Sequence, residues 1–276
     1  MINFRKYVNK ALLSLIMLIF ACFMITPLIW MFSTSFKPDL EVYRRPFQLI
    51  SGNFHFNNYI EALTGFPFLI WYWNSIKVAV ITILLATTSS IMAGYAFGRL
   101  KFRAKNVIFM IFLANMMIPM EIRLIPQFFL YRQMGLVNTH AAVILPWIFY
   151  AFGIFFFRQV FKTIPAELSE VAKIDGAGEF RIFLNIILPL VKTSVITIIL
   201  LCFNGIWNNY LMPLVYISSV NKQLLPVGLS FFKTEYADRI AISMAGMSMA
   251  IIPLIALFLA LQKYFVEGIT VTGLKI

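Results

Sequence analysis

The residues of this sequence best suited to chemistry gather in one polar stretch, SEVAKIDGAGEFRIF, at residues 169–183. It contains the carboxylates of Glu170, Asp175 and Glu179, together with Gly176. Carboxylates inside a membrane can relay protons or hold ions, so the surroundings of these three decide what they can do. Apolar runs bound the stretch on both sides, ILPWIFYAFGIFFF before it and IILPLVKTSVITIILL after it.

Other patterns that carry chemistry are missing from the sequence. It contains no GxxxxGK[ST] phosphate-binding loop and no Ser/His/Asp constellation. Its two histidines, His55 and His140, are far apart, and Cys22 and Cys202 form no CxxC motif. We therefore expect no catalytic, cofactor-binding or metal-binding residue, and a chain that is not itself an enzyme.

A second group of candidates lies in an apolar segment nearer the C-terminus. Asn204 and Asn208 are four residues apart and would share one face of a helix. Amides in an apolar span are costly unless partnered, which makes them functional candidates. Hydrogen bonding between helices is the simpler interpretation, and a functional role is the alternative. Trp207, Asn209 and Tyr210 lie in the same segment.

The elements that must position both groups are membrane helices. The chain of 276 residues is 61% hydrophobic and 12% charged, whereas soluble domains are roughly 45–50% apolar and about 25% charged. A helix needs about 20 apolar residues to cross the hydrocarbon, where lipid offers the backbone no hydrogen-bond partner. We expect an all-α fold, a single polytopic membrane domain over residues 1–276. Its six transmembrane helices are predicted at about 12–32, 75–98, 107–128, 141–157, 183–217 and 241–265.

The second predicted span carries a stripe of small side chains. They recur every four residues, at Thr82, Ala86, Ser90, Gly94 and Gly98. Such a stripe lets another helix backbone approach closely. Ordinary packing in a bundle is the simpler interpretation, and a substrate path is the alternative.

The positive charge is distributed unevenly between the connections. The formal net charge is +12, and Arg99, Lys101, Arg103 and Lys105 crowd the second connection. This positive-inside bias places both termini and the connection at residues 163–182 in the cytoplasm. The basic excess therefore reflects membrane topology, not nucleic-acid binding. It also places Glu170, Asp175 and Glu179 outside the hydrocarbon, where they cannot act as intramembrane acids.

The polar connection itself is predicted to form a short helix. Pro165 suits the first turn of that helix, and Gly176 suits the left-handed position just past its end. From these residues alone, a plain connector and a docking element are equally good interpretations.

The same segment resembles the EAA loop of ABC-importer membrane subunits. That loop has the approximate pattern E-A-A-x-x-D-G-A, followed by an apolar helix that ends in I-x-L-P. The matching residues here are Glu170, Ala172, Asp175, Gly176 and Ala177, followed by Ile186–Pro189, with Val171 in place of one alanine. The chain from about Trp73 onwards is similar to sugar-importer permeases of the maltose-transporter G-subunit type. That similarity rests on NSIKVAVITILLATTSSIMAGYAFGRLKF, GLVNTHAAVILPW, FNGIWNNYLMPLVYI and IIPLIALFLALQKYFVEGI.

The resemblance implies the transmembrane domain of a type I ABC importer, with its core at about residues 71–264. Such a chain forms half of a translocation pathway for a mono- or oligosaccharide, in the plasma (inner) membrane of a bacterium. Its implied partners are a second, non-identical permease subunit, two ATP-binding subunits that hold ATP and Mg, an extracytoplasmic solute-binding protein and the lipid bilayer. The EAA-like loop would couple the chain to the ATPases. The candidate translocation path is the set that resembles the family's W-N-D-F region: Asn204, Trp207, Asn208, Asn209 and Tyr210, with Asn209 where the family usually has Asp.

Two alternatives remain open at this point. The cargo of an ABC permease could instead be a glycerol phosphate, an acidic sugar or a peptide. An ATP-independent secondary transporter or channel would need internal repeats and buried ionisable groups, and the sequence displays neither clearly. Trp207 and Tyr210 could stack on a sugar ring or form part of an interfacial aromatic belt.

Overall fold

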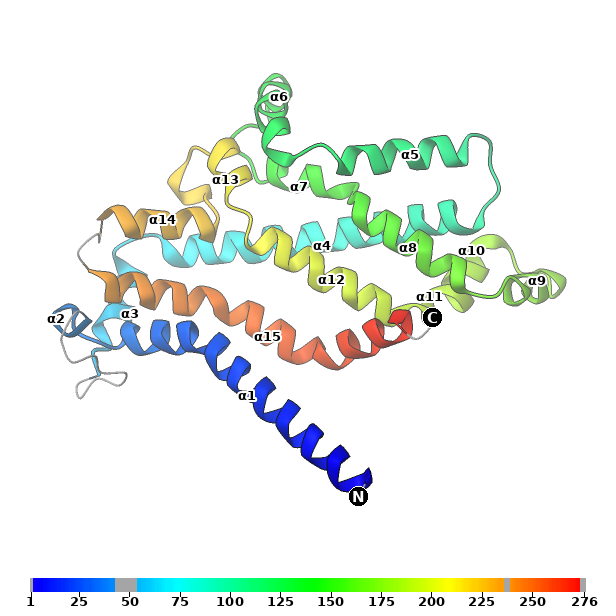
Figure 1. The fold of residues 1–276 in the computed structure, drawn as a ribbon. Coiled ribbons are helices and arrows are strands. Elements are labelled where there is room, and N and C mark those ends of the chain that lie inside the picture. The colour runs from blue at the N-terminus through cyan, green and yellow to red at the C-terminus, as the bar shows by residue number, and fades with distance from the viewer. Residues whose placement is uncertain (1, 43–53, 236–238, 274–276) are drawn as a thin grey trace. The chain divides into compact units, whose positions relative to one another are not determined.

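The computed structural model describes residues 2–42, 54–235 and 239–273, and every regular element in these ranges is helical (Figure 1). Four helices are long and apolar enough to cross a membrane, at Tyr7–Ser35, Phe68–Arg99, Ala141–Thr163 and Ile240–Lys263. The number rises to six if two sharply bent helix pairs each count as one span. The prediction of an all-α membrane fold is confirmed.

Contacts divide the chain into two compact units. The first contains residues 1–68 and 229–252, and the second contains residues 69–228 and 253–276. The helices of the first unit are α1 (Ile2–Ser35), α2 (Asp39–Val42) and α3 (Asn57–Thr64), with parts of α14 (Leu225–Glu235) and α15 (Ile240–Gly273).

Polar contacts hold the first unit together beside the ends of its long helices. The Asn58 amide donates to the backbone carbonyls of Ser35 (2.9 Å) and Lys37 (2.8 Å). Arg239 donates to Glu61 and, at 3.0 Å, to Asp39, and these hydrogen bonds raise the pKa of its guanidinium. By contrast, the most apolar part of α1 buries none of its residues within this chain.

The core of the second unit is the contact between α4 (Phe68–Arg99) and α8 (Ala151–Thr163). A Cβ atom placed on Gly94 would lie 2.4 Å from the Cβ of Phe157, and one on Gly153 would lie 2.4 Å from the Ser90 hydroxyl. The two helices can therefore approach this closely only because glycine has no side chain. The predicted stripe of small residues on α4 is a packing face, with Thr82, Ala86 and Ser90 fully buried.

A cluster of buried apolar side chains extends this core towards residues 163–182. Tyr95 of α4 lies 5.6 Å from Phe161 of α8 and 4.8 Å from Phe183, measured between ring centroids. Ala172 and Ile187 are buried in the same cluster. The elements after α8 that contribute to it are α9 (Glu167–Ile174), α10 (Glu179–Ile182), a π-helix at Phe183–Ile187 and α12 (Lys192–Trp207).

Two of the predicted spans are bent in the structure. Residues 107–128 are divided between α5 (Lys105–Met116) and α6 (Met120–Gln133), which meet at 102°. Pro119 stands at the bend with an extended ψ of 142°. A proline cannot donate a hydrogen bond to the preceding turn and disfavours helical conformation in the residue before it, so α5 ends before Pro119. Residues 183–217 are divided by a 77° bend at Val191, two residues after Pro189, and again before α13 (Leu211–Tyr216). The remaining helices are α7 (Ala141–Ile148), α11 (Leu188–Leu190) and a 3₁₀ turn at Val220–Lys222.

The approach of α4 to α8 is testable at Gly94. We expect Gly94→Ala to lower the free energy of unfolding by about 1–3 kcal/mol, because the new methyl group overpacks the contact. The matched control is Gly178→Ala, since Gly178 has an ordinary φ of −70° and nothing within 4 Å of an added Cβ. Thermal unfolding in detergent would measure both, and equal melting temperatures would contradict the packing role of Gly94.

Candidate functional site

The connection at residues 163–182 is attached to the membrane helices where it begins. The guanidinium of Arg99, at the end of α4, donates to the carbonyls of Ile164 (2.5 Å) and Pro165 (3.2 Å). These bonds satisfy carbonyls that follow the end of α8 and have no helical partner. Helix α9 starts two residues later and buries Ala172, of which 6% is exposed, in the apolar cluster of α4 and α8.

Helix α9 ends in a Schellman motif around Gly176. Gly176 has a φ of +77°, and its N–H donates to the carbonyl of Lys173 at 3.0 Å. The N–H of Ala177 donates to the carbonyl of Ala172 at 2.9 Å. This pair of bonds requires a left-handed residue that glycine supplies without strain. The predicted left-handed conformation of Gly176 is confirmed.

The far end of the connection returns to the same helix, α4. Glu179 forms an ion pair with Lys173 and accepts a hydrogen bond from the Tyr95 hydroxyl at 3.1 Å. The hydrogen bond from Lys173 lowers the pKa of the Glu179 carboxyl, which is partly exposed outside the predicted spans. Because Arg99 and Tyr95 are four residues apart on α4, both ends of the connection are attached to the same part of that helix.

The outer surface of the connection exposes apolar side chains beside acidic ones. Ile174 is 85% exposed and Phe180 is 70% exposed, and Leu168 and Val171 are exposed too. Glu170 and Asp175 are exposed on the same short helix and its cap. Large apolar side chains in such a position are typical of a surface that binds another protein.

The second predicted group separates into two kinds of residue. Asn204 and Asn208 share an exposed face of α12, as predicted, and the Asn208 amide donates to the Asn204 side-chain oxygen at 3.0 Å. Tyr210 is exposed after them. Asn209 and Trp207 are buried: the Asn209 side-chain oxygen accepts from the Met212 N–H at 3.1 Å, and Trp207 stacks on Phe203 at 5.3 Å.

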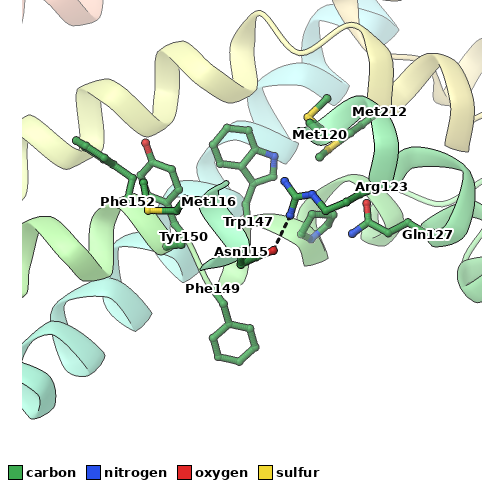
Figure 2. A pocket seen from close by; sticks show the side chains of 12 residues that line it. Asn115, Met116, Met120, Arg123, Gln127, Trp147, Phe149, Tyr150, Phe152 and Met212 are labelled. Atoms are coloured by element: carbon green, nitrogen blue, oxygen red, sulfur yellow. Dashed lines mark hydrogen bonds between the residues drawn. The ribbon is translucent and has the colours of Figure 1, made fainter. Parts of the chain in front are cut away.

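A cavity of about 270 Å³ in the second unit was missed by the sequence reasoning (Figure 2). It is lined by Asn115, Met116, Met120, Arg123, Gln127, Pro146, Trp147, Phe149, Tyr150, Ala151, Phe152 and Met212. None of the five predicted path residues lines it, although Met212 lies only two residues after Tyr210. The sequence did contain one indication of this cavity. Arg123 is a charged side chain inside the predicted span 107–128, and a charge within a span usually marks function.

Comparisons with known proteins identify the family. Residues 90–271 match the model of the binding-protein-dependent transport system inner membrane component. The chain is 37% identical to the arabinooligosaccharides transport system permease protein AraQ of Halalkalibacterium halodurans, over 90% of each chain. It is 30% identical to the sn-glycerol-3-phosphate transport system permease protein UgpE of Brucella abortus, over 97% of this chain and 98% of the relative.

A solved structure agrees with these relatives. The chain superimposes with a TM-score of 0.80 and 27% identity on a chain of a bacterial ABC transporter involved in the import of the acidic polysaccharide alginate, covering 94% of this chain and 96% of that one. The chain belongs to the family of inner membrane components of binding-protein-dependent transport systems. It is a multi-pass permease subunit with the fold of an ABC-importer transmembrane domain.

The wall of the cavity at Trp147 depends on Gly205 of α12. A Cβ atom on Gly205 would lie 2.6 Å from the Cη2 atom of the Trp147 indole. We therefore expect Gly205→Val to displace the indole and shift the tryptophan fluorescence of the purified chain. The shift should vanish in a Trp147→Phe background, and a shift that persists there would show that another tryptophan reports the change.

Proposed function

We propose that this chain is the permease subunit of an ATP-driven, binding-protein-dependent ABC importer for a carbohydrate. It forms half of the translocation pathway with a second, non-identical permease subunit. Two ATP-binding subunits supply ATP hydrolysis with Mg, and an extracytoplasmic solute-binding protein delivers the cargo. The observation that carries the proposal is the connection at residues 163–182, which is fixed to α4 at both ends and exposes an apolar and acidic surface.

The chain couples to the ATPases through that surface. Leu168, Val171 and Ile174 provide the apolar contact, and the exposed carboxylates of Glu170 and Asp175 suit a basic rim on the partner. Displacement of the docked α9 passes to α4 and α8 through Ala172 and the bonds of Arg99 and Glu179. The uneven distribution of positive charge supports a cytoplasmic position for this connection and for both termini.

The names of the relatives support a carbohydrate cargo and leave one alternative. An arabinooligosaccharide permease and an alginate importer are among the proteins most similar to the chain. A glycerol-phosphate permease that is 30% identical matches 97% of the chain. We propose that the exposed amide pair of Asn204 and Asn208 faces the translocation path, with Trp207, Asn209 and Tyr210 fixing the helix end beside it.

Reconstitution tests the importer directly. The chain alone should hydrolyse no ATP, because it has no phosphate-binding loop. With its partners in proteoliposomes, we expect ATP hydrolysis that the loaded binding protein stimulates, and uptake of a labelled oligosaccharide, with an arabinooligosaccharide and an oligogalacturonate as the neutral and acidic probes. Uptake of labelled sn-glycerol 3-phosphate in its place would establish the alternative cargo. Transport by this chain alone without ATP would overturn the proposal in favour of a secondary transporter.

Gly176 tests the coupling role of the loop. Gly176→Val should strain the cap, because a left-handed conformation costs a non-glycine residue roughly 1–2 kcal/mol and a β-branched one more. Gly178→Val is the control, since neither glycine has an atom within 4 Å of an added Cβ and only Gly176 has a positive φ. We expect Gly176→Val to keep normal membrane abundance and lose uptake, while Gly178→Val keeps most of both.

Binding of the purified ATP-binding subunits to membrane vesicles locates the defect. Inside-out vesicles that carry the wild-type chain should capture these subunits, and right-side-out vesicles should not. Weaker capture or uncoupled uptake by the Gly176→Val chain supports the docking role. Wild-type uptake by that variant would reduce the loop to a connector, and capture by right-side-out vesicles would reverse the proposed orientation.

A further inference from the structure

The cavity of Figure 2 forms where helices of the second unit bend or end, at three places along the chain. The bend between α5 and α6 brings Asn115 and Arg123 together, and the Arg123 guanidinium donates to the Asn115 side-chain oxygen at 3.1 Å. The break between α7 and α8 supplies Trp147, Tyr150 and Phe152. Met212, in the first turn of α13, closes another side.

Arg123 brings a positive charge to this cavity, and no carboxylate among the described residues opposes it there. Among the residues that the structure describes, no Asp or Glu lies within ion-pair distance of Arg123 or lines the cavity. Its Nε–H is buried and has no hydrogen-bond partner in the described ranges. Arg123 as a whole is partly exposed, and a guanidinium carries five N–H donors. The cavity therefore offers hydrogen-bond donors and a positive charge to an anionic group.

Two neutral side chains that line the cavity also have N–H groups that can donate hydrogen bonds. The indole N–H of Trp147 is buried and lacks a partner in the part of the chain that the structure describes. In Figure 2 its nitrogen-bearing edge faces the Arg123 guanidinium. The Gln127 side-chain oxygen accepts from the Tyr216 hydroxyl at 3.0 Å, which leaves the Gln127 amino group as a donor.

The remaining wall is aromatic and apolar. The rings of Trp147 and Tyr150 lie 5.6 Å apart between centroids, and Phe152 follows at 6.0 Å from Tyr150. Met116, Met120 and Met212 add flexible thioether side chains. Aromatic faces with a few placed donors are the usual lining of small-molecule sites, and the volume of about 270 Å³ is slightly below the roughly 300–1,000 Å³ typical of them.

We propose that this cavity binds one residue of a saccharide that carries a carboxylate, and that Arg123 determines the preference for the acidic group. The carboxylate accepts from Arg123, hydroxyl oxygens accept from Trp147 and Gln127, and the apolar face of the ring packs on Tyr150 and Trp147. A planar fork of donors matches a carboxylate better than a lysine ammonium does. This inference rests on the proposed function, because it names the cargo class of the same importer.

Equilibrium binding to the assembled importer tests the proposal. The complex, placed in lipid nanodiscs without the binding protein, is titrated with labelled digalacturonate and with digalactose as its neutral counterpart. We expect the wild-type complex to bind the acidic disaccharide more tightly. Arg123→Gln should weaken that binding about 10- to 100-fold, as expected for losing a hydrogen-bonded charge, and should change digalactose binding far less. Arg123→Lys keeps the charge without the fork and should recover part of the preference.

Arg132→Gln is the matched control, because Arg132 is an exposed arginine of the same helix, α6, and does not line the cavity. It should leave both affinities unchanged. Equal binding of the two disaccharides by the wild-type complex would overturn the inference, as would equal losses in Arg123→Gln and Arg132→Gln. Loss of the second permease subunit from the Arg123→Gln complex would overturn it too, since Arg123 would then pair with a carboxylate of that partner. ATP-driven uptake of a neutral saccharide alongside any of these results would leave the proposed function intact.

Discussion

The close approach of α4 and α8 is the constraint on which both candidate sites depend. Gly94 and Gly153 leave no room for a side chain between the two helices. With that spacing, Tyr95 and Arg99 of α4 reach the connection that follows α8. The same spacing fixes the start of α8, where Tyr150 and Phe152 line the cavity. Packed helices move as rigid bodies and deform little internally, so the loop and the cavity are attached to one solid element.

Helix α8 therefore joins two surfaces of different chemistry. Its 13 residues span about 20 Å at 1.5 Å per residue, from the aromatic wall at one end to the Arg99-bound carbonyls at the other. Arg158 on this helix lies 3.9 Å from the Phe109 ring centroid, which attaches α5 as well. A tilt of α8 must then displace the cavity wall and the loop together. The coupling that we propose would then need no separate relay of side chains between the two sites.

Local backbone chemistry could be predicted from the sequence, and the convergence of distant side chains could not. The left-handed Gly176 and the small residues of α4 follow from steric rules that act within a few residues. The span 107–128 contains two prolines, and only one of them breaks it: α6 continues through Pro126, whereas Pro119 stands at the 102° bend. The sequence alone does not show which of the two prolines will break the helix, because tertiary packing determines that. The cavity depends on that bend. For this reason the sequence did not indicate that Arg123 and Trp147 would line the same cavity.

The isolated apolar surface of α1 has a mechanical consequence of its own. The apolar stretch Tyr7–Ser35 has 29 residues, or about 43 Å of helix, against roughly 30 Å of hydrocarbon. A helix longer than the bilayer must lean, kink or thicken the lipid around it. Neighbouring helices normally set the angle of lean, but within this chain no residue of that stretch's most apolar window is buried. No buried contact of that window within this chain then fixes the inclination of α1, so a thinner or thicker bilayer would change that inclination.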